Sequence, residues 1–233
     1  MTSDTLGMMK PKRPHRNILL IMERDNFEKD RELIAGITSH LHISDHELLW
    51  YNPLGAGKNA FLDPTGKLAS YPRSRRRLIK AMRLLLYPDY WKHYLSLRSV
   101  REKTVEGKVE NLRRFLRRYP DARITILSRS AGGRISSLLA NEAGVAKLVC
   151  LGYPFKHPDH DDEPARYQHL DTLRTPFLIL QGMRDQYGGT GTEQQYALSP
   201  LITLEYVDTD HDFKLSEKKW SEVIERINQF LRQ

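Results

Sequence analysis

The chain has 233 residues, and its 37 Lys and Arg against 29 Asp and Glu give a formal net charge of +8. That length suits one large domain or two small ones, and a hydrophobic share of 39% is ordinary for a globular protein. No apolar run approaches the ~18 residues of a membrane-spanning helix, and the basic N-terminus lacks the apolar stretch of a secretory signal. These features favour a cytoplasmic protein. The single cysteine, Cys150, excludes an internal disulfide and is expected to be a buried, inert thiol.

The positive charge is concentrated in one region. Residues 72–118 contain 15 Lys and Arg but only four Asp and Glu, a net charge of +11. A basic field of this size could attract an anionic ligand such as phosphate, nucleic acid or anionic lipid. It is also compatible with a set of solvated helix faces, so the charge alone leaves both interpretations open.

Short apolar runs alternate with helical patterns along the chain. The basic, Pro-containing residues 1–16 are expected to form a flexible tail. Strands are predicted from short, mainly apolar runs at residues 18–22, which is a buried-strand candidate, and at 48–51, 123–127, 147–151, 176–181 and 201–207. Helices are predicted from apolar periodicity at residues 27–41, 104–119, 131–141 and 216–231. Ser216 is a plausible N-cap of the last helix.

This alternation predicts an α/β fold in which a mainly parallel sheet of about six strands carries helices on both faces. Residues 17–233 are expected to form a single domain. Residues 54–103 do not fit the alternation, because they combine basic residues with clustered Tyr and Trp. We interpret them as a partly helical insertion after the second strand, which could act as a lid. Parallel sheets place ligand sites at the carboxyl ends of their strands, so the loops there matter most.

The strongest motif follows the third predicted strand. Residues 124–134 read Ile-Thr-Ile-Leu-Ser-Arg-Ser-Ala-Gly-Gly-Arg: an apolar strand, a turn built on Ser130, and small residues that open a helix. A nucleophile elbow of the form Gly-x-Ser-x-Gly needs small residues two positions before and after its serine, because the serine backbone is strained. Here those positions hold Ser128 and Gly132. The turn would place the N–H of Ala131 where it can stabilise an oxyanion. A Gly-rich turn with an incidental serine is the alternative.

The order of the partner residues favours the catalytic interpretation. Hydrolases built on this elbow carry Ser, then an acid, then His along the chain. Asp185 follows the fifth predicted strand after a glycine, and His211 follows the sixth in a polar loop. In such a triad His211 takes the proton of Ser130, and Asp185 fixes the tautomer of His211 and stabilises its imidazolium. An ordinary loop Asp and a surface His remain the alternative.

The other histidines give weaker signals. His40, His42 and His46 lack a fixed ligand spacing, so no metal site is expected there. The second group, His157, His160 and His169, follows the fourth strand among acidic residues, where it could shape a pocket or simply be solvated.

Three segments together resemble a known group. They are residues 128–134, residues 148–155 with their Leu-Gly-Tyr-Pro-Phe run, and Gln181 to Asp185 taken with Asp210 to Lys214. They are similar to the dienelactone-hydrolase-related branch of the α/β-hydrolase superfamily, which includes the Tex30 and KANSL3-type proteins. The resemblance covers the chain from about Ile124 onward. It implies an α/β-hydrolase fold with Ser130, Asp185 and His211 at the triad positions, while the substrates of this branch are poorly defined.

The N-terminal half departs from the pattern of these relatives. They carry a His-Gly-x-Gly-like stretch after the first strand, which supplies the second oxyanion N–H. Here residues 22–26 read Met-Glu-Arg-Asp-Asn, with no glycine. Losing one oxyanion donor typically costs about 10²–10³ in rate. Arg24 or Asn26 could compensate for the missing donor.

Two functions follow from these observations. The first is a serine hydrolase that cleaves an ester or thioester through an acyl-enzyme on Ser130, with Ala131 and Arg24 as oxyanion donors and with no metal or organic cofactor. The alternative is a hydrolase-fold binding protein with a degenerate site, which uses its basic region for an acidic partner. The sequence indicates neither the oligomeric state nor the identity of the substrate.

Overall fold

The computed structural model describes the six strands of a sheet and most of the carboxyl-terminal half of the chain. The described residues are 16–22, 36–51, 72, 74–75, 78–79, 82, 104–142 and 144–233. The proposed tail before Arg16, the segment 23–35 that contains Arg24, and most of the insertion at 54–103 lie outside the described residues. The single-domain boundaries and the lid therefore stay predictions.

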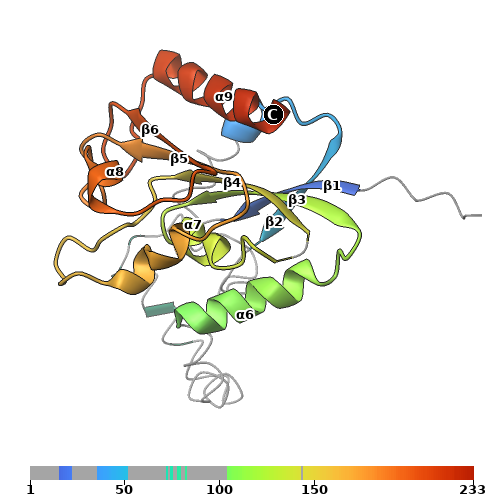
Figure 1. The fold of residues 1–233 in the computed structure, drawn as a ribbon, viewed down its shortest axis with the longest axis horizontal. Coiled ribbons are helices and arrows are strands. Elements are labelled where there is room, and N and C mark those ends of the chain that lie inside the picture. The colour runs from blue at the N-terminus through green and yellow to red at the C-terminus, as the bar shows by residue number, and fades with distance from the viewer. Residues whose placement is uncertain are drawn as a thin grey trace, which may run out of the picture.

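Six parallel strands form one twisted sheet through the centre of the molecule (Figure 1). In chain order the strands are β1 (Arg16–Met22), β2 (His46–Tyr51), β3 (Ala122–Arg129), β4 (Val145–Leu151), β5 (Phe177–Gly182) and β6 (Ile202–Val207). Their spatial order is β2-β1-β3-β4-β5-β6, and every pairing is parallel. The expected α/β architecture is confirmed, because each predicted apolar run became one strand of a parallel sheet.

The strand order reverses direction at β1. From β1 the chain first moves outward to β2 and then returns to β3 on the other side of β1. The register pairs Met22 with Ser128, so the ends of β1 and β3 lie side by side. In open parallel sheets, ligands bind at the carboxyl ends of the strands that flank such a reversal. Ser130 follows β3 directly at this point.

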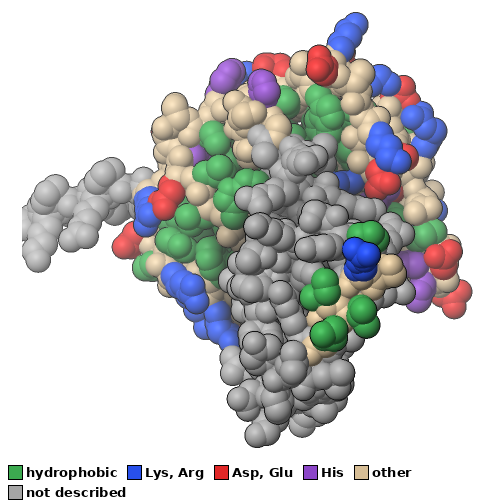
Figure 2. Space-filling model, turned by 180° about the vertical axis from the view of Figure 1, so that it is seen from behind, with side chains coloured by type: hydrophobic (Ala, Val, Ile, Leu, Met, Phe, Trp, Pro, Cys, Tyr) green, Lys and Arg blue, Asp and Glu red, His purple; other side chains and the backbone are tan. Residues whose placement is uncertain are grey.

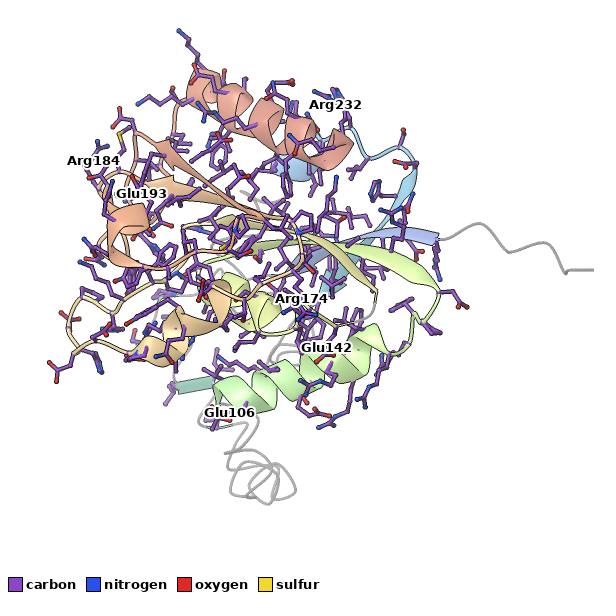
Figure 3. The ribbon with its side chains drawn as sticks, in the orientation of Figure 1. Glu106, Glu142, Arg174, Arg184, Glu193 and Arg232 are labelled. Carbon is purple, nitrogen blue, oxygen red and sulfur yellow. The ribbon has the colours of Figure 1, made fainter. Side chains whose placement is uncertain are left out.

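Helices α6 (Val105–Leu116) and α7 (Ala131–Ser137) cover one face of the sheet (Figure 1). Thr104 caps α6, since its side chain accepts a hydrogen bond from Gly107 N at 3.1 Å. The apolar side of α6 packs with α7 and the even-numbered face of β1 and β3 into one core. Glu142 lies beside α6 (Figure 3), where its carboxylate accepts a hydrogen bond from Arg113 Nε at 2.8 Å.

Helix α9 (Glu217–Arg232) covers the opposite face together with residues 36–41. Ser216 caps α9 by accepting from Lys219 N at 3.5 Å, as expected from the sequence. At the other end of the helix, Lys147 Nζ donates to the carbonyl oxygens of Phe230 and Leu231 at 3.0 and 2.8 Å. These bonds satisfy carbonyls that a helix leaves without intrahelical partners.

Helix α7 is shorter than the periodicity predicts, because it ends at Ser137 rather than Asn141. The hydroxyls of Ser136 and Ser137 donate to the carbonyl oxygens of Gly133 and Arg134 at 3.1 and 3.0 Å. Such local bonds compete with the helical ladder, and the chain continues through tighter turns instead. A second small correction concerns Arg16, which belongs to β1 rather than the tail and pairs with Glu47 of β2.

The remaining short elements lie in the loops at the carboxyl half of the chain. They are the 3-10 turns η2 (Pro164–Arg166) and η3 (Gln168–Leu170) and the short helix α8 (Thr192–Gln195). In the part of the chain that the structure describes, no helix is both long and apolar enough to cross a membrane. Apolar side chains are nevertheless visible on the surface (Figure 2), and the exposed ones include Leu48 and Trp50 of β2.

Candidate active site

Ser130 lies on a sharp turn between β3 and α7. Its backbone has φ 49° and ψ −120°, a positive φ that a non-glycine residue seldom adopts. The turn is held in place because Ser130 N donates to Leu151 O at 3.0 Å and Gly133 N donates to Ser130 O at 2.8 Å. A strained residue of this kind persists only where the surrounding structure fixes it.

The residues around the turn are small, and neighbouring groups pack closely against them. Ser128 is fully buried, and its hydroxyl donates to Val149 O at 2.9 Å, so a serine replaces the usual glycine without leaving a buried polar group unpaired. A Cβ at Gly133 would collide with Sγ of Cys150 on β4. Burial raises the pKa of the Cys150 thiol to about 12, so the thiol stays neutral and serves as packing.

The three residues expected to act together lie within hydrogen-bond distance. Ser130 Oγ is 2.9 Å from Nε2 of His211, and Nδ1 of His211 is 2.8 Å from Oδ2 of Asp185. A carboxylate only accepts hydrogen bonds, so Nδ1 carries the proton and Nε2 is left to accept from the Ser130 hydroxyl. The structure therefore brings together side chains from the ends of β3, β5 and β6 in the order that proton transfer requires.

Asp185 is fully buried, and protein donors surround both of its oxygens. Gln181 Nε2 donates to Oδ2 at 2.8 Å, and the backbone N–H of Tyr187 donates to Oδ1 at 2.8 Å. Hydrogen bonds to a buried carboxylate offset the cost of removing it from water. These bonds also fix the plane of the carboxylate and therefore the direction from which it receives His211.

The imidazole of His211 is enclosed on several sides. The ring of Tyr187 packs against it with centroids 4.4 Å apart. On another side, a Cβ added to Gly152, whose φ is +65°, would come within 3.3 Å of both Asp185 Oδ2 and His211 Nδ1. Two residues beyond the histidine, Phe213 is buried and also has a positive φ of 54°. His211 thus sits in a narrow slot, with only about a tenth of its side chain exposed.

A cavity of about 280 Å³ opens beside His211. Its lining residues are Arg184, Gln186, Tyr187, Asp210, His211 and Asp212. Arg184, which follows β5 at the carboxyl edge of the sheet (Figure 3), forms an ion pair with Asp208. A hydrogen bond from Lys219, together with that ion pair, lowers the pKa of Asp208 to about 2. The entrance next to the histidine is therefore polar and carries fixed charges of both signs.

The other histidines have separate roles in the structure. The Nε2 atom of His169 lies 2.8 Å from Ser137 Oγ, and burial beside Arg134 lowers the pKa of His169 to about 4. His157 packs edge-on against Tyr187, whose ring in turn contacts His211. These two histidines therefore contact other side chains, while residues 158–162 of the same loop are exposed. Within the described ranges, no three His, Cys, Asp or Glu side chains gather as metal ligands would.

Sequence reasoning did not find three residues that support the site. Gln181 and Gly152 contact the Asp185–His211 pair, and Arg129 donates from Nη2 to the carbonyl oxygen of His211 at 3.1 Å. Their positions in the sequence could have indicated them, since each residue stands at or just after the carboxyl end of a buried strand. Arg24, expected as an oxyanion donor, lies outside the described residues.

The sequence of the chain also matches a known protein family. A family model described as "Alpha/beta hydrolase domain" matches residues 96–233, which is more than half of the chain. The chain belongs to the α/β-hydrolase family. The match begins before α6 and includes Ser130, Asp185 and His211. The finer placement in the dienelactone-hydrolase-related branch stays a prediction. No curated protein matches this α/β hydrolase.

Solved structures show the same fold at low sequence identity. A serine hydrolase homologue from Coxiella burnetii is 16% identical, with a TM-score of 0.55 over 93% of this chain and 85% of that one. XC6422 from Xanthomonas campestris, described as an α/β serine hydrolase without lid, is 13% identical, with a TM-score of 0.55 over 96% and 84%. The esterase Pf2001 from Pyrococcus furiosus is 12% identical, with a TM-score of 0.55 over 94% and 83%. In another crystal form of that esterase the match spans 60% of its chain.

Proposed function

We propose that this α/β hydrolase is a serine hydrolase that cleaves a carboxylic ester or thioester through an acyl-enzyme on Ser130. The observation that carries the proposal is the continuous hydrogen-bonded chain from Ser130 Oγ through His211 to Asp185, with distances of 2.9 and 2.8 Å. A nucleophile, a base and a group that orients the base, each within hydrogen-bond reach of the next, are the parts that acyl transfer requires.

The first half of the reaction forms the acyl-enzyme. Ser130 Oγ attacks the carbonyl carbon of the substrate while His211 Nε2 takes the hydroxyl proton, and Asp185 stabilises the resulting imidazolium. The tetrahedral intermediate then collapses, the bond to the leaving oxygen or sulfur breaks, and His211 returns its proton to the departing alcohol or thiol. The acyl group is left on Ser130 as an ester.

The second half releases the acid. A water molecule attacks the acyl carbon while His211 takes one of its protons, and collapse of the second intermediate frees the carboxylic acid as Ser130 regains its proton. The closeness of Ser130 Oγ to His211 Nε2 supports both halves, since the same nitrogen serves as base and then as acid.

The oxyanion of each intermediate needs hydrogen-bond donors. Ala131 is the first residue of α7, and the first N–H groups of a helix have no intrahelical acceptor. Its N–H, next to Ser130, is our proposed first donor. Arg24 is our proposed second donor, in place of the glycine loop of related enzymes. The substitution Arg24→Ala is then expected to lower kcat by about 10²-fold while KM stays within a few-fold.

The binding-protein alternative depends on the basic region, of which the structure describes α6. There the cations are partly neutralised: Arg113 pairs with Glu110 and Glu142, and Arg114 pairs with Glu110. This pairing weakens the argument for a dedicated anion site on α6. An anionic ligand elsewhere on residues 72–118 stays a prediction.

The test is hydrolysis of short-chain p-nitrophenyl esters and thioesters by the purified full-length chain. The wild-type protein should release p-nitrophenolate, with an initial burst under conditions in which deacylation is slower than acylation. Ser130→Ala should lower kcat by about 10⁴-fold or more. Ser136→Ala is the matched control and should keep wild-type rates, since Ser136 is a buried serine on α7 whose hydroxyl donates to Gly133 O. A Ser130→Ala variant that retains the wild-type rate would refute the proposal.

A further inference from the structure

The residue directly before the nucleophile also contacts the base loop. Arg129 is the last residue of β3, and only 4% of its side chain is exposed. Its guanidinium donates from Nη2 to the carbonyl oxygen of His211 at 3.1 Å. The same nitrogen lies 3.8 Å from Oδ1 of Asp212, so Arg129 also forms an ion pair with the residue that follows His211. One buried cation thus holds two consecutive residues of the base loop.

We propose that Arg129 is a positioning residue that fixes the backbone of His211 relative to Ser130. This inference rests on the proposed function only where it concerns rates. The peptide bond between Arg129 and Ser130 joins the nucleophile to the group that holds the base. A displacement of the base loop away from Ser130 would therefore break the contacts of a buried guanidinium, which is costly where water cannot replace them.

Other parts of the base loop are held by residues outside the nucleophile strand. Phe213 anchors the far end of the loop, and its backbone N–H donates to Asp210 O at 3.3 Å. On the β5 side, a Cβ at Gly182 would come within 2.9 Å of the carbonyl oxygens of Thr209 and Asp210, so this strand packs directly on the loop. Arg129 supplies the attachment to β3, the strand that also carries Ser130.

Arginine suits this position better than lysine. The guanidinium is planar and offers several N–H donors from one rigid group, so it can face a carbonyl oxygen and a carboxylate together. A lysine ammonium is a compact point charge on a flexible stem and would hold one of these oxygens at a time. Arg129→Lys is therefore expected to preserve part of the hold on the base loop, while Arg129→Met removes all of it.

The kinetic test compares Arg129→Met, Arg129→Lys and Asp212→Asn with the wild-type enzyme on a p-nitrophenyl ester. Misplacement of a catalytic group by about 1 Å can cost 10²-fold in rate, so Arg129→Met should lower kcat by about 10²-fold with KM within twofold. Arg129→Lys should fall between Arg129→Met and wild type, and Asp212→Asn should show a smaller loss than Arg129→Met.

Lys147→Met is the matched control, because Lys147 is also a strand cation that donates to carbonyl oxygens of another element, but at the opposite end of the sheet. It should lower the melting temperature without changing kcat. Wild-type kcat in folded Arg129→Met would overturn the inference. Should Arg129→Met fail to fold, Arg129→Lys and Asp212→Asn decide: unchanged kcat in both overturns the inference, and a loss in both supports it.

A second readout needs no substrate. In protein with ¹⁵N-labelled histidine, the Nδ1 proton that His211 shares with Asp185 should give a strongly downfield proton resonance, because it lies in a short charge-assisted hydrogen bond. Arg129→Met and Arg129→Lys should broaden or shift this resonance, while Lys147→Met should leave it sharp. An unchanged resonance in both Arg129 variants contradicts the inference even if no ester is hydrolysed. Absence of hydrolysis by the wild-type protein would instead refute the proposed function alone.

Discussion

The two ends of the strands use polar residues for different purposes. At the carboxyl end, Ser130, His211 and Asp185 are enclosed by protein and linked by hydrogen bonds of 2.8–2.9 Å. At the amino end, Lys147 donates to the last carbonyls of α9, and Arg16 pairs with Glu47 on the surface. Charged residues at the amino end therefore tie elements together, while the carboxyl end holds the proposed catalytic groups in a fixed geometry. Substitutions at the two ends should therefore change different measurements.

The largest effect is expected at the buried acid. Asp185→Asn keeps the size of the side chain but removes the carboxylate that fixes the tautomer of His211, so kcat should fall by about 10⁴-fold. Steady-state hydrolysis of a p-nitrophenyl ester measures this loss. Asp171→Asn, an exposed aspartate just after η3, is the matched control and should keep the wild-type rate. Equal rates for both variants would remove Asp185 from the mechanism.

A medium effect is expected from protonation of His169, which contacts Ser137 at the end of α7. Its folded pKa of about 4 is below the ~6.5 of an unfolded histidine, so the unfolded state binds more protons between these values. Stability should therefore fall as the pH drops from 6.5 towards 4, by at most about 2 kcal/mol at pH 5.

Denaturant unfolding at pH 7 and pH 5 measures this effect. His169→Gln should reduce the loss of stability between the two pH values, since the titrating group is gone. His157→Gln, which replaces a histidine in the same loop that packs on Tyr187, should leave the loss as in the wild type. An identical pH dependence in His169→Gln and wild type would show that other groups cause it.

A smaller effect is expected at Gln181. Gln181→Leu removes the donor to Asp185 Oδ2. Because this is a hydrogen bond to a charged group, its loss is expected to lower kcat by about tenfold. The substitution also removes the buried Oε1, which has no hydrogen-bond partner among the described residues, so the fold should tolerate it. Kinetics and melting temperature measured on one preparation separate the two effects. Wild-type kcat would show that Asp185 is held without Gln181.

The smallest effect is expected at the amino end. Lys147→Met removes two hydrogen bonds to the end of α9 and should cost about 1 kcal/mol of unfolding free energy with kcat unchanged. Urea unfolding and ester hydrolysis measure the two quantities. A fall in kcat at unchanged stability would contradict the division between the two ends.

The sequence predicts the strands well because the central ones are short apolar runs, as expected for strands covered on both faces of a parallel sheet. It also predicts which three loops meet, since carboxyl ends of parallel strands share one edge. It does not predict the end of α7, where two serine hydroxyls bond back to the helix. Nor does it reveal Arg129, Gly152 or Gln181, because their contacts depend on the register of strands far apart in the chain.

Covalent labelling by a fluorophosphonate probe, followed by peptide mapping, reports directly whether Ser130 is an activated nucleophile. We expect a single adduct on Ser130 in the wild-type protein, strongly reduced labelling in His211→Gln because the hydroxyl loses its base, and no adduct in Ser130→Ala. Labelling of another residue at the wild-type rate, or no adduct on Ser130 in folded wild-type protein, would contradict the claim that the carboxyl end of the sheet holds an activated serine.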